Sequence, residues 1–510
     1  MSETLTVRKV NEVWLKISCS DSVKRELWEH FSYFAPSYKW NKKFKLKLWD
    51  GKIHMFDLRS STIYVGLMRN IAIFCRDRNY KIDCDFSPTE NSLSEVEFDE
   101  FLKEINVTMP PRDYQRKTVI KSIRRKRATF LSPTASGKSY IIYLILRYLN
   151  VKSLLIVPTT NLVMQMRNDF KEYAENDDWD IEDETSIIMS GYSKSNLNQI
   201  VISTWQSLQD MPSEWFHDNE FDCIILDEAH GGKAVSIKSI MEKNLSAEYR
   251  FGFTGTLDDV QINELLISGL FGPVHQVVET KELIDNKTLS DLEIKCITFH
   301  YSKETKKKYF TDLKLALEEK KEKSPRQNSA AFVYNHEVEF LLSQEKRNKF
   351  VGNLALSLKG NSLILFNRVE AHGKVLYDML KDNDKGKKVF FIAGEVNAKI
   401  REEIRKTVDE NKKDCIIIGS QGTVSTGVNI VNLHNIILAA STKSKIKVLQ
   451  TIGRGLRRGS EKENCTFYDL SDDLSSKTKN NYTYQHAMER MKLYIKSGFK
   501  YKNYDVELEQ

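Results

Sequence analysis

Two stretches of the sequence alternate short apolar runs with longer amphipathic segments, and this alternation constrains the fold more than any other feature. One stretch extends from residue 109 to about 290, and the other from 361 to 470, within a second predicted domain of residues 291–470. Alternation of this kind is typical of βαβ units whose strands form a parallel sheet. We therefore predict an α/β protein with two tandem parallel-sheet domains and a solvated helix at the highly charged segment 303–323. The apolar runs lie at 153–157, 200–203, 223–226, 363–366, 389–392, 415–418 and 436–439.

Three further segments complete the predicted organisation, because 510 residues are too many for a single hydrophobic core. Residues 1–84 mix aliphatic, aromatic and basic residues and predict a small α+β domain. Residues 85–108 predict an acidic linker, since seven acidic residues and only one lysine lie between Asp85 and Glu104. Residues 471–510 predict a basic C-terminal tail.

Composition excludes some classes of protein and permits others. No apolar run approaches the ~20 residues that a membrane-spanning helix needs, and the N-terminus lacks the pattern of a signal peptide. The seven cysteines include no C-x-x-C pair, which argues against a zinc site and suits a reducing cytosol. The net charge of +7 permits a polyanionic partner without requiring one. We expect a cytoplasmic protein with no membrane contact.

The segment Ser132–Ser139 has the composition of a phosphate-binding loop. It follows a strand-like run and precedes an apolar helix, so the backbone N–H groups of Thr134, Ala135 and Ser136 and the helix N-terminus would surround a phosphate. Gly137 would let the chain curl closely, Lys138 would reach the β- and γ-phosphates, and the Ser139 hydroxyl would hold Mg²⁺. Because Ser132 stands where the usual pattern has its first glycine, a chance Gly-Lys-Ser turn remains an equal alternative for this segment taken alone.

The second motif, Asp227-Glu228-Ala229-His230, is acidic and follows the apolar run that ends at Leu226. Ligands of doubly wound sheets bind at the carboxyl ends of strands, so Asp227 is placed to hold Mg²⁺ and Glu228 to activate the attacking water. The alternative is an acidic cap on the following segment, which the upstream phosphate loop makes much less favourable.

Arg454 and Arg457 lie three residues apart in the second alternating stretch, a spacing that puts them on one face of a helix. Two guanidinium groups that reach a γ-phosphate would stabilise the charge of the transition state. Taken alone, such a pair is more often a solvated basic surface or a nucleic-acid contact, but its position after a second alternating stretch favours the contact with the γ-phosphate.

Together these motifs resemble those of superfamily 2 helicases over residues 112–470. The resemblance implies two RecA-like domains and hydrolysis of ATP with Mg²⁺. It implies adenine recognition by Arg112 and Gln115, and further nucleotide contacts from Gly427 and Asn429. Coupling of nucleotide state to motion would fall to His230, Thr254, Gly255, Thr256 and Gln450. Contacts with the nucleic-acid backbone would come from Pro158, Thr159, Thr204, Trp205, Phe366, Ser425 and Thr426.

A closer resemblance, carried by Trp49–Ile53, Gly252–Leu257 and Gly422–Arg458, is to the UvsW family of branched-DNA helicases of T-even bacteriophages. It implies branch migration, fork regression and dissociation of D-loops and R-loops, in the cytoplasm of a host cell. DNA would be the main partner, with the RNA of R-loops and single-strand-binding or recombination proteins as further partners of a monomer. An RNA helicase and the motor subunit of a restriction nuclease remain alternatives.

The segment from Lys39 to Phe56 interleaves aromatic residues with six lysines and one aspartate. Lysines neutralise phosphates and aromatic rings stack on exposed bases, so Lys42, Lys43, Lys45 and Trp49 are candidate DNA-binding residues. An equally supported alternative is a small domain whose aromatic residues form its core and whose lysines only solvate its surface.

Overall fold

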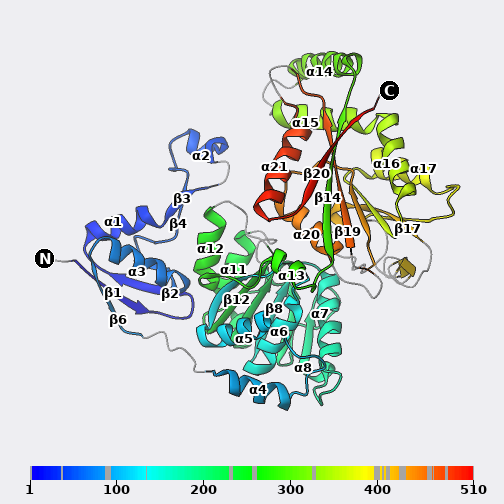
Figure 1. Ribbon diagram of the computed structural model, residues 1–510. Helices are drawn as coiled ribbons and strands as arrows, with labels where there is room; N and C mark the ends of the chain where they lie inside the picture. The colour runs from blue at the N-terminus through cyan, green and yellow to red at the C-terminus, as the bar shows by residue number, and fades with distance from the viewer. Residues whose placement is uncertain are drawn as a thin grey trace. The chain divides into compact units, whose positions relative to one another are not determined.

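The computed structural model describes residues 3–508 with internal gaps, and its contacts divide the chain into two compact units, Met1–Val278 and Glu279–Gln510. Each unit contains one seven-stranded parallel sheet with helices around it (Figure 1). No helix of the described residues is both long and apolar enough to cross a membrane. The internal gaps are 36–37, 87–92, 134, 229–233, 256–260, 324–328, 395–402, 405–406, 409–413, 424–431, 457–461, 463 and 477–479.

The first unit opens with a small mixed domain, as predicted. Its four-stranded sheet has the order β5-β2-β1-β6, in which β1 pairs antiparallel with β2 and parallel with β6. The strands are β1 Thr4–Lys9, β2 Trp14–Ser18, β5 Thr62–Tyr64 and β6 Lys81–Cys84, and the helices are α1 Asp21–His30, the 3₁₀ turn η2 Val65–Leu67 and α3 Met68–Asp77. A two-stranded ribbon, β3 Ser32–Phe34 and β4 Lys52–His54, carries the 3₁₀ turn η1 Tyr38–Trp40 and the short helix α2 Lys42–Lys45. We call residues 32–54 the basic lobe.

The sheet of the first motor domain has the strand order β13-β7-β12-β11-β8-β10-β9, and every pairing is parallel. Its central strands β8 and β11 are buried along their whole length, as expected for strands that helices cover on both faces. The strands are β7 Arg127–Leu131, β8 Ser153–Val157, β9 Thr185–Ile188, β10 Ile200–Thr204, β11 Cys223–Asp227, β12 Tyr249–Thr254 and β13 Val274–Gln276. The helices are α4 Glu95–Glu104, α5 Asp113–Arg125, α6 Lys138–Leu149, α7 Thr160–Tyr173, α8 Ile181–Glu184, α9 Trp205–Leu208, α10 Ser213–Asp218, α11 Ala234–Lys243 and α12 Gln261–Phe271.

The N-terminal domain and the first motor domain share one hydrophobic core. A single buried cluster contains Leu15 and Phe74 of the former together with Leu226 and Phe271 of the latter. The Tyr64 hydroxyl donates a 2.7 Å hydrogen bond to Glu242, and η2 packs on α12. Within the range 85–108, α4 likewise buries Phe98 and Leu102 in the core of the motor domain. The first unit is therefore one packed body rather than a motor with a tethered module.

The second unit repeats the topology of the first. Its sheet has the order β16-β17-β15-β18-β19-β14-β20. When the strands of each sheet are numbered along the chain from β7 and from β14, the two orders are the same, read from opposite edges. The strands are β14 Asp291–His300, β15 Ser362–Phe366, β16 Lys388–Ile392, β17 Cys415–Ser420, β18 Asn435–Leu438, β19 Asn464–Asp473 and β20 Tyr501–Glu507. The helices are α13 Thr280–Asp285, α14 Lys303–Lys323, α15 Ser329–Leu342, α16 Glu345–Ser357, the π-helix η3 Val369–Lys374, α17 Val375–Leu380, α20 Lys445–Gly455 and α21 Tyr482–Lys496. The predicted class, two tandem RecA-like domains after a small α+β domain, is confirmed.

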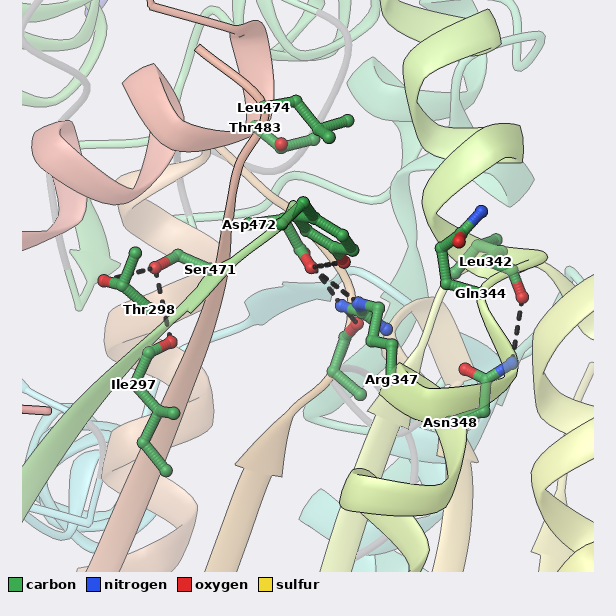
Figure 2. Close-up of polar contacts among 12 residues, drawn as sticks. Ile297, Thr298, Leu342, Gln344, Arg347, Asn348, Ser471, Asp472, Leu474 and Thr483 are labelled. Atoms are coloured by element: carbon green, nitrogen blue, oxygen red, sulfur yellow. Dashed lines mark hydrogen bonds and ion pairs between the residues drawn. The ribbon is translucent and has the colours of Figure 1, made fainter. Parts of the chain in front are cut away.

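Buried ion pairs fasten the helices of the second unit to its sheet. Figure 2 shows the Arg347 guanidinium of α16 against the Asp472 carboxylate of β19, with Nε–Oδ1 and Nη2–Oδ2 distances of 2.8 and 3.0 Å. Arg490 of α21 binds Asp469 in the same way, and β20 pairs with β14 along seven residues. The segment after residue 470 thus lies within the sheet and core of this unit.

Candidate functional site: the nucleotide site and the basic lobe

The phosphate loop joins β7 to α6 in a conformation that two residues make possible. Ala135 and Gly137 both have left-handed φ angles, 66° and 80°. Gly137 precedes Lys138 directly, and a Cβ atom at Gly137 would collide with the side-chain amide of Gln115. The glycine is therefore required here by both its backbone angle and its close neighbour.

Two polar side chains brace this loop. The Gln115 amide accepts a 2.9 Å hydrogen bond from the backbone of Arg112 and donates one of 3.0 Å to the Ser136 carbonyl. Ser132, which replaces the usual glycine, lies 2.6 Å from the Ser136 hydroxyl through its own hydroxyl, and its N–H donates to the Thr254 carbonyl of β12. A serine at position 132 thus stabilises the loop, a role that sequence spacing alone did not indicate.

The acidic motif lies at the carboxyl end of β11, beside the loop lysine. Lys138 forms ion pairs with Glu228 and, at 3.7 Å, with Asp227 Oδ1. Burial favours the neutral amine, but the two carboxylates outweigh it and raise the pKa of Lys138. Burial likewise raises the pKa of Asp227 to about 6, although Lys138 opposes that shift. Charged groups of opposite sign are therefore concentrated where a phosphate–metal complex would bind.

These residues fit a magnesium ion that takes some of its ligands from the protein and the others from the phosphates of the nucleotide. Asp227 Oδ1 is buried and accepts no hydrogen bond from the described residues, so it can serve as a ligand. Among the described residues no group of three or more His, Cys, Asp and Glu side chains gathers to hold a metal. Proteins usually bind Mg²⁺ through one or two carboxylates, waters and substrate phosphates.

Four of the residues expected to contact nucleic acid, Pro158, Thr159, Thr204 and Trp205, lie at the carboxyl ends of the neighbouring strands β8 and β10. Thr159 caps α7 and Thr204 caps α9, each by accepting a hydrogen bond from a backbone N–H, and Pro158 and Trp205 are half-buried. Phe366 of β15 is instead fully buried and packs against Phe391, so its side chain cannot contact a nucleic-acid strand.

The structure describes only some of the residues predicted to couple the nucleotide to motion or to contact it from the second unit. Gln450 lies on α20, and so does the backbone of Arg454, four residues further along the same helix. Thr254 is fully buried and Gly255 follows it at the end of β12. Outside the described residues lie Thr134, His230, Thr256, Ser425, Thr426, Gly427, Asn429 and Arg457.

The basic lobe contains a cluster of contacting aromatic rings, none of which is fully buried, and one tryptophan that projects into solvent. Tyr38 stacks on Phe34 at 4.5 Å and meets Phe44 edge-on at 4.8 Å, while the Trp49 indole donates to the Lys52 carbonyl. Trp40 is 76% exposed, and the Lys45 ammonium lies 5.4 Å from its ring centroid. Lys42, Lys43 and Lys45 are exposed. Among the described aromatic residues of the lobe Trp40 is the most exposed, ahead of Phe34 at 49%, so its ring is the best placed to stack on a base. The sequence did not single out Trp40 as a candidate DNA-binding residue.

A tandem pair of RecA-like sheets, with a phosphate loop and an acidic motif at the carboxyl ends of the first, is the architecture of a helicase motor, and the matching family models place it in superfamily 2. These models are the UvsW DNA helicase N-terminal domain over residues 6–85, the type III restriction enzyme res subunit over 108–259 and the helicase conserved C-terminal domain over 345–459. The chain is 33% identical to the ATP-dependent DNA helicase uvsW of Enterobacteria phage T4 over 515 residues, 96% of each chain. It belongs to the UvsW helicase family and is an ATP-dependent helicase.

Two other comparisons place this assignment in context. The crystal structure of T4 UvsW matches the whole chain at 32% identity, with a TM-score of 0.50. The restriction-modification enzyme LlaBIII bound to DNA matches 78% of this chain and 32% of its own at 15% identity, with a TM-score of 0.56. That second likeness concerns the fold alone. The predicted family and enzyme class are confirmed.

Proposed function

We propose that this chain is an ATP-driven DNA helicase that remodels branched DNA, by branch migration, fork regression and dissociation of D-loops and R-loops, in recombination, replication and repair. The observation that carries the proposal is the 33% identity to a phage DNA helicase over 96% of both chains. The RNA-helicase alternative has a shared fold in its favour, because the RNA-bound structures of Dbp5 and Mss116p are 13% and 17% identical. The restriction-motor alternative also has the type III restriction res-subunit model in its favour, but that model matches only residues 108–259, and the likeness to LlaBIII is at 15% identity.

In the proposed reaction the chain's own groups bind Mg²⁺ and ATP and activate water. Lys138 would neutralise the β- and γ-phosphates, while Ser139 and Asp227 would hold Mg²⁺, whose charge stabilises the transferring phosphoryl group. Glu228 would orient and deprotonate the attacking water. Arg454 and Arg457 of the second unit would stabilise the transition state. We further propose adenine recognition by Arg112 and Gln115, with loop or nucleotide contacts from Thr134, Ala135, Ser136, Gly137, Gly427 and Asn429, and coupling through His230, Thr254, Gly255, Thr256 and Gln450.

For the DNA, we propose a path over the carboxyl ends of the sheets. Because Phe366 is buried, the next residue, Asn367, is the better candidate on the second unit. The other contacts would be Pro158, Thr159, Thr204, Trp205, Ser425 and Thr426. RNA in R-loops, single-strand-binding or recombination proteins, a monomeric state and a host-cell cytoplasmic location stay predictions.

The basic lobe is our candidate for recognising the branch itself. Its exposed lysines, Lys42, Lys43 and Lys45, would neutralise duplex phosphates, and Trp40 would stack where a junction leaves bases unpaired. Trp49 has a structural role, since its indole N–H donates a hydrogen bond to the Lys52 carbonyl within the lobe. The lobe belongs to the same packed unit as the phosphate loop, so a branch bound there would lie on the body that binds ATP.

The test is an ATPase and unwinding assay with single-stranded DNA, a DNA fork, a four-way junction and RNA. We expect the junction and the fork to be unwound and to stimulate hydrolysis most strongly, and Lys138→Ala to abolish both activities. Equal or greater stimulation by RNA, with no unwinding of branched DNA, would overturn the proposed substrate while leaving the ATPase assignment intact.

A further inference from the structure

The Tyr173 hydroxyl lies 2.8 Å from the Ser139 hydroxyl, inside the first motor domain. Tyr173 is the last residue of α7 and Ser139 the second of α6, so this hydrogen bond joins the phosphate loop to a different helix. The Tyr173 ring packs against Tyr140 and Tyr143, with centroids 4.9 and 5.6 Å away. The phenol is thereby held in place by aromatic packing and is not a mobile surface group.

A serine hydroxyl that binds a metal ion has to direct its proton elsewhere. The oxygen carries two lone pairs and one proton, and a lone pair that points at Mg²⁺ leaves the proton pointing away from it. Inside a protein that proton needs an acceptor, since an unsatisfied buried donor is costly. A phenol hydroxyl such as that of Tyr173 can both donate and accept a hydrogen bond.

We propose that Tyr173 is a positioning residue for magnesium, because it accepts the Ser139 proton and so turns a lone pair of Ser139 toward the ion. This inference rests on the proposed function of Ser139 as a Mg²⁺ ligand. Tyr173 acts through Ser139 and contacts neither the ion nor the nucleotide. Its contribution is to the affinity for the divalent cation, not to the affinity for the phosphates.

The two neighbouring tyrosines supply matched controls. The Tyr143 hydroxyl accepts a hydrogen bond from Arg147, and the Tyr140 hydroxyl donates to the Met109 carbonyl, so neither faces Ser139. Tyr140→Phe, Tyr143→Phe and Tyr173→Phe each remove one hydroxyl from the same aromatic cluster. A loss caused by looser packing would be common to all three, whereas a loss of positioning would be confined to Tyr173→Phe.

The experiment titrates Mn²⁺, which reports on the Mg²⁺ site, into full-length protein with saturating ADP and measures free Mn²⁺ by electron paramagnetic resonance. A lost hydrogen bond of ordinary net strength should weaken Mn²⁺ binding about three- to tenfold in Tyr173→Phe. ADP affinity in EDTA should stay unchanged, and the two control variants should match the wild type. Ser139→Ala should weaken Mn²⁺ binding at least as much, and the double variant should be no worse than Ser139→Ala.

Two results would overturn the inference, and they differ from failure of the proposed function. If Tyr173→Phe binds Mn²⁺ like the wild type while Ser139→Ala does not, Tyr173 has no positioning role. If all three tyrosine variants weaken Mn²⁺ binding equally, the effect is one of packing. If Ser139→Ala itself leaves Mn²⁺ binding unchanged, the proposed metal role of Ser139 is wrong.

Discussion

Neutralising the lysines of the basic lobe should reduce both the affinity for a four-way junction and the dependence of that affinity on salt. The triple variant Lys42→Gln, Lys43→Gln and Lys45→Gln changes only exposed residues of α2. The cap of α2, in which Asn41 accepts from the Lys43 N–H, involves the backbone and is kept. The aromatic contacts among Phe34, Tyr38 and Phe44 are also untouched, so the fold of the lobe should persist.

The magnitude follows from counterion release. Each phosphate that a lysine neutralises on duplex DNA contributes ~0.9 to the slope of log affinity against log salt. Three lysines therefore contribute a slope of about 2.7, which amounts to about fortyfold in affinity between 50 and 200 mM salt. Trp40→Ala should act differently, because lost stacking costs ~1–3 kcal/mol at every salt concentration and leaves the slope unchanged.

The assay is fluorescence anisotropy of a labelled four-way junction at several salt concentrations. A control variant with the same change of charge, Arg8→Gln, Lys16→Gln and Lys81→Gln, neutralises exposed residues on the sheet of the same domain. Equal slopes for the lobe variant, the control variant and the wild type would refute the reasoning, since the lobe lysines would then be solvated surface. Deleting residues 1–100 is not a substitute, because it would strip the shared core around Leu226 and Phe271 and expose apolar surface.

Three further predictions concern catalysis and stability. Glu228→Gln should still bind ATP but hydrolyse it about 10²–10⁴-fold more slowly, which single-turnover kinetics measures; a near wild-type rate would exclude Glu228 as the base. Arg454→Ala should lower kcat by about 10³–10⁵ with little change in nucleotide affinity, which kinetics and equilibrium binding together test; a loss confined to affinity would contradict the assignment. His372 is fully buried, and burial, with a smaller effect of Arg347, lowers its pKa to about 3. Because the unfolded imidazole takes up a proton near pH 6.5, the free energy of unfolding should fall by about 1.6 kcal/mol from this group between pH 6.5 and 5. His372→Leu should remove that part of the fall in urea titrations, and a profile parallel to the wild type would refute it.

The sequence predicts the sheets and the first nucleotide-binding motifs because both depend on local patterns. Apolar runs such as 153–157 and 223–226 coincide with buried parallel strands, and the charged segment 303–323 with α14. Lys138 and Asp227 meet because β7 and β11, although β12 lies between them, end at the same edge of one parallel sheet.

Contacts between segments that are distant in the sequence could not be predicted from such local patterns. The bond between Tyr173 and Ser139 and the Tyr64–Glu242 contact join residues 34 and 178 positions apart, and no local periodicity encodes them. The sequence also could not show which aromatic residues of the lobe pack and which are exposed, because the same residue type, tryptophan, occurs in both places. Only the fold separates Trp49, bonded to Lys52, from Trp40.

The repeated topology raises the question of why only one of the two sheets would bind the metal–nucleotide complex. Both sheets present a buried basic–acidic pair near the carboxyl ends of their strands, Lys138 with Asp227 in the first and Arg347 with Asp472 in the second. In the first, Asp227 Oδ1 accepts no hydrogen bond from the described residues and faces a flexible amine that can turn toward a phosphate. In the second, both oxygens of Asp472 accept hydrogen bonds from the planar Arg347 guanidinium (Figure 2). The Tyr301 hydroxyl donates a further hydrogen bond to Asp472. A bidentate arginine pair satisfies the carboxylate and leaves it little capacity to bind a cation. We therefore infer that the same topology gives a ligand site in the first motor domain and a structural brace in the second, because the partner of the acid differs.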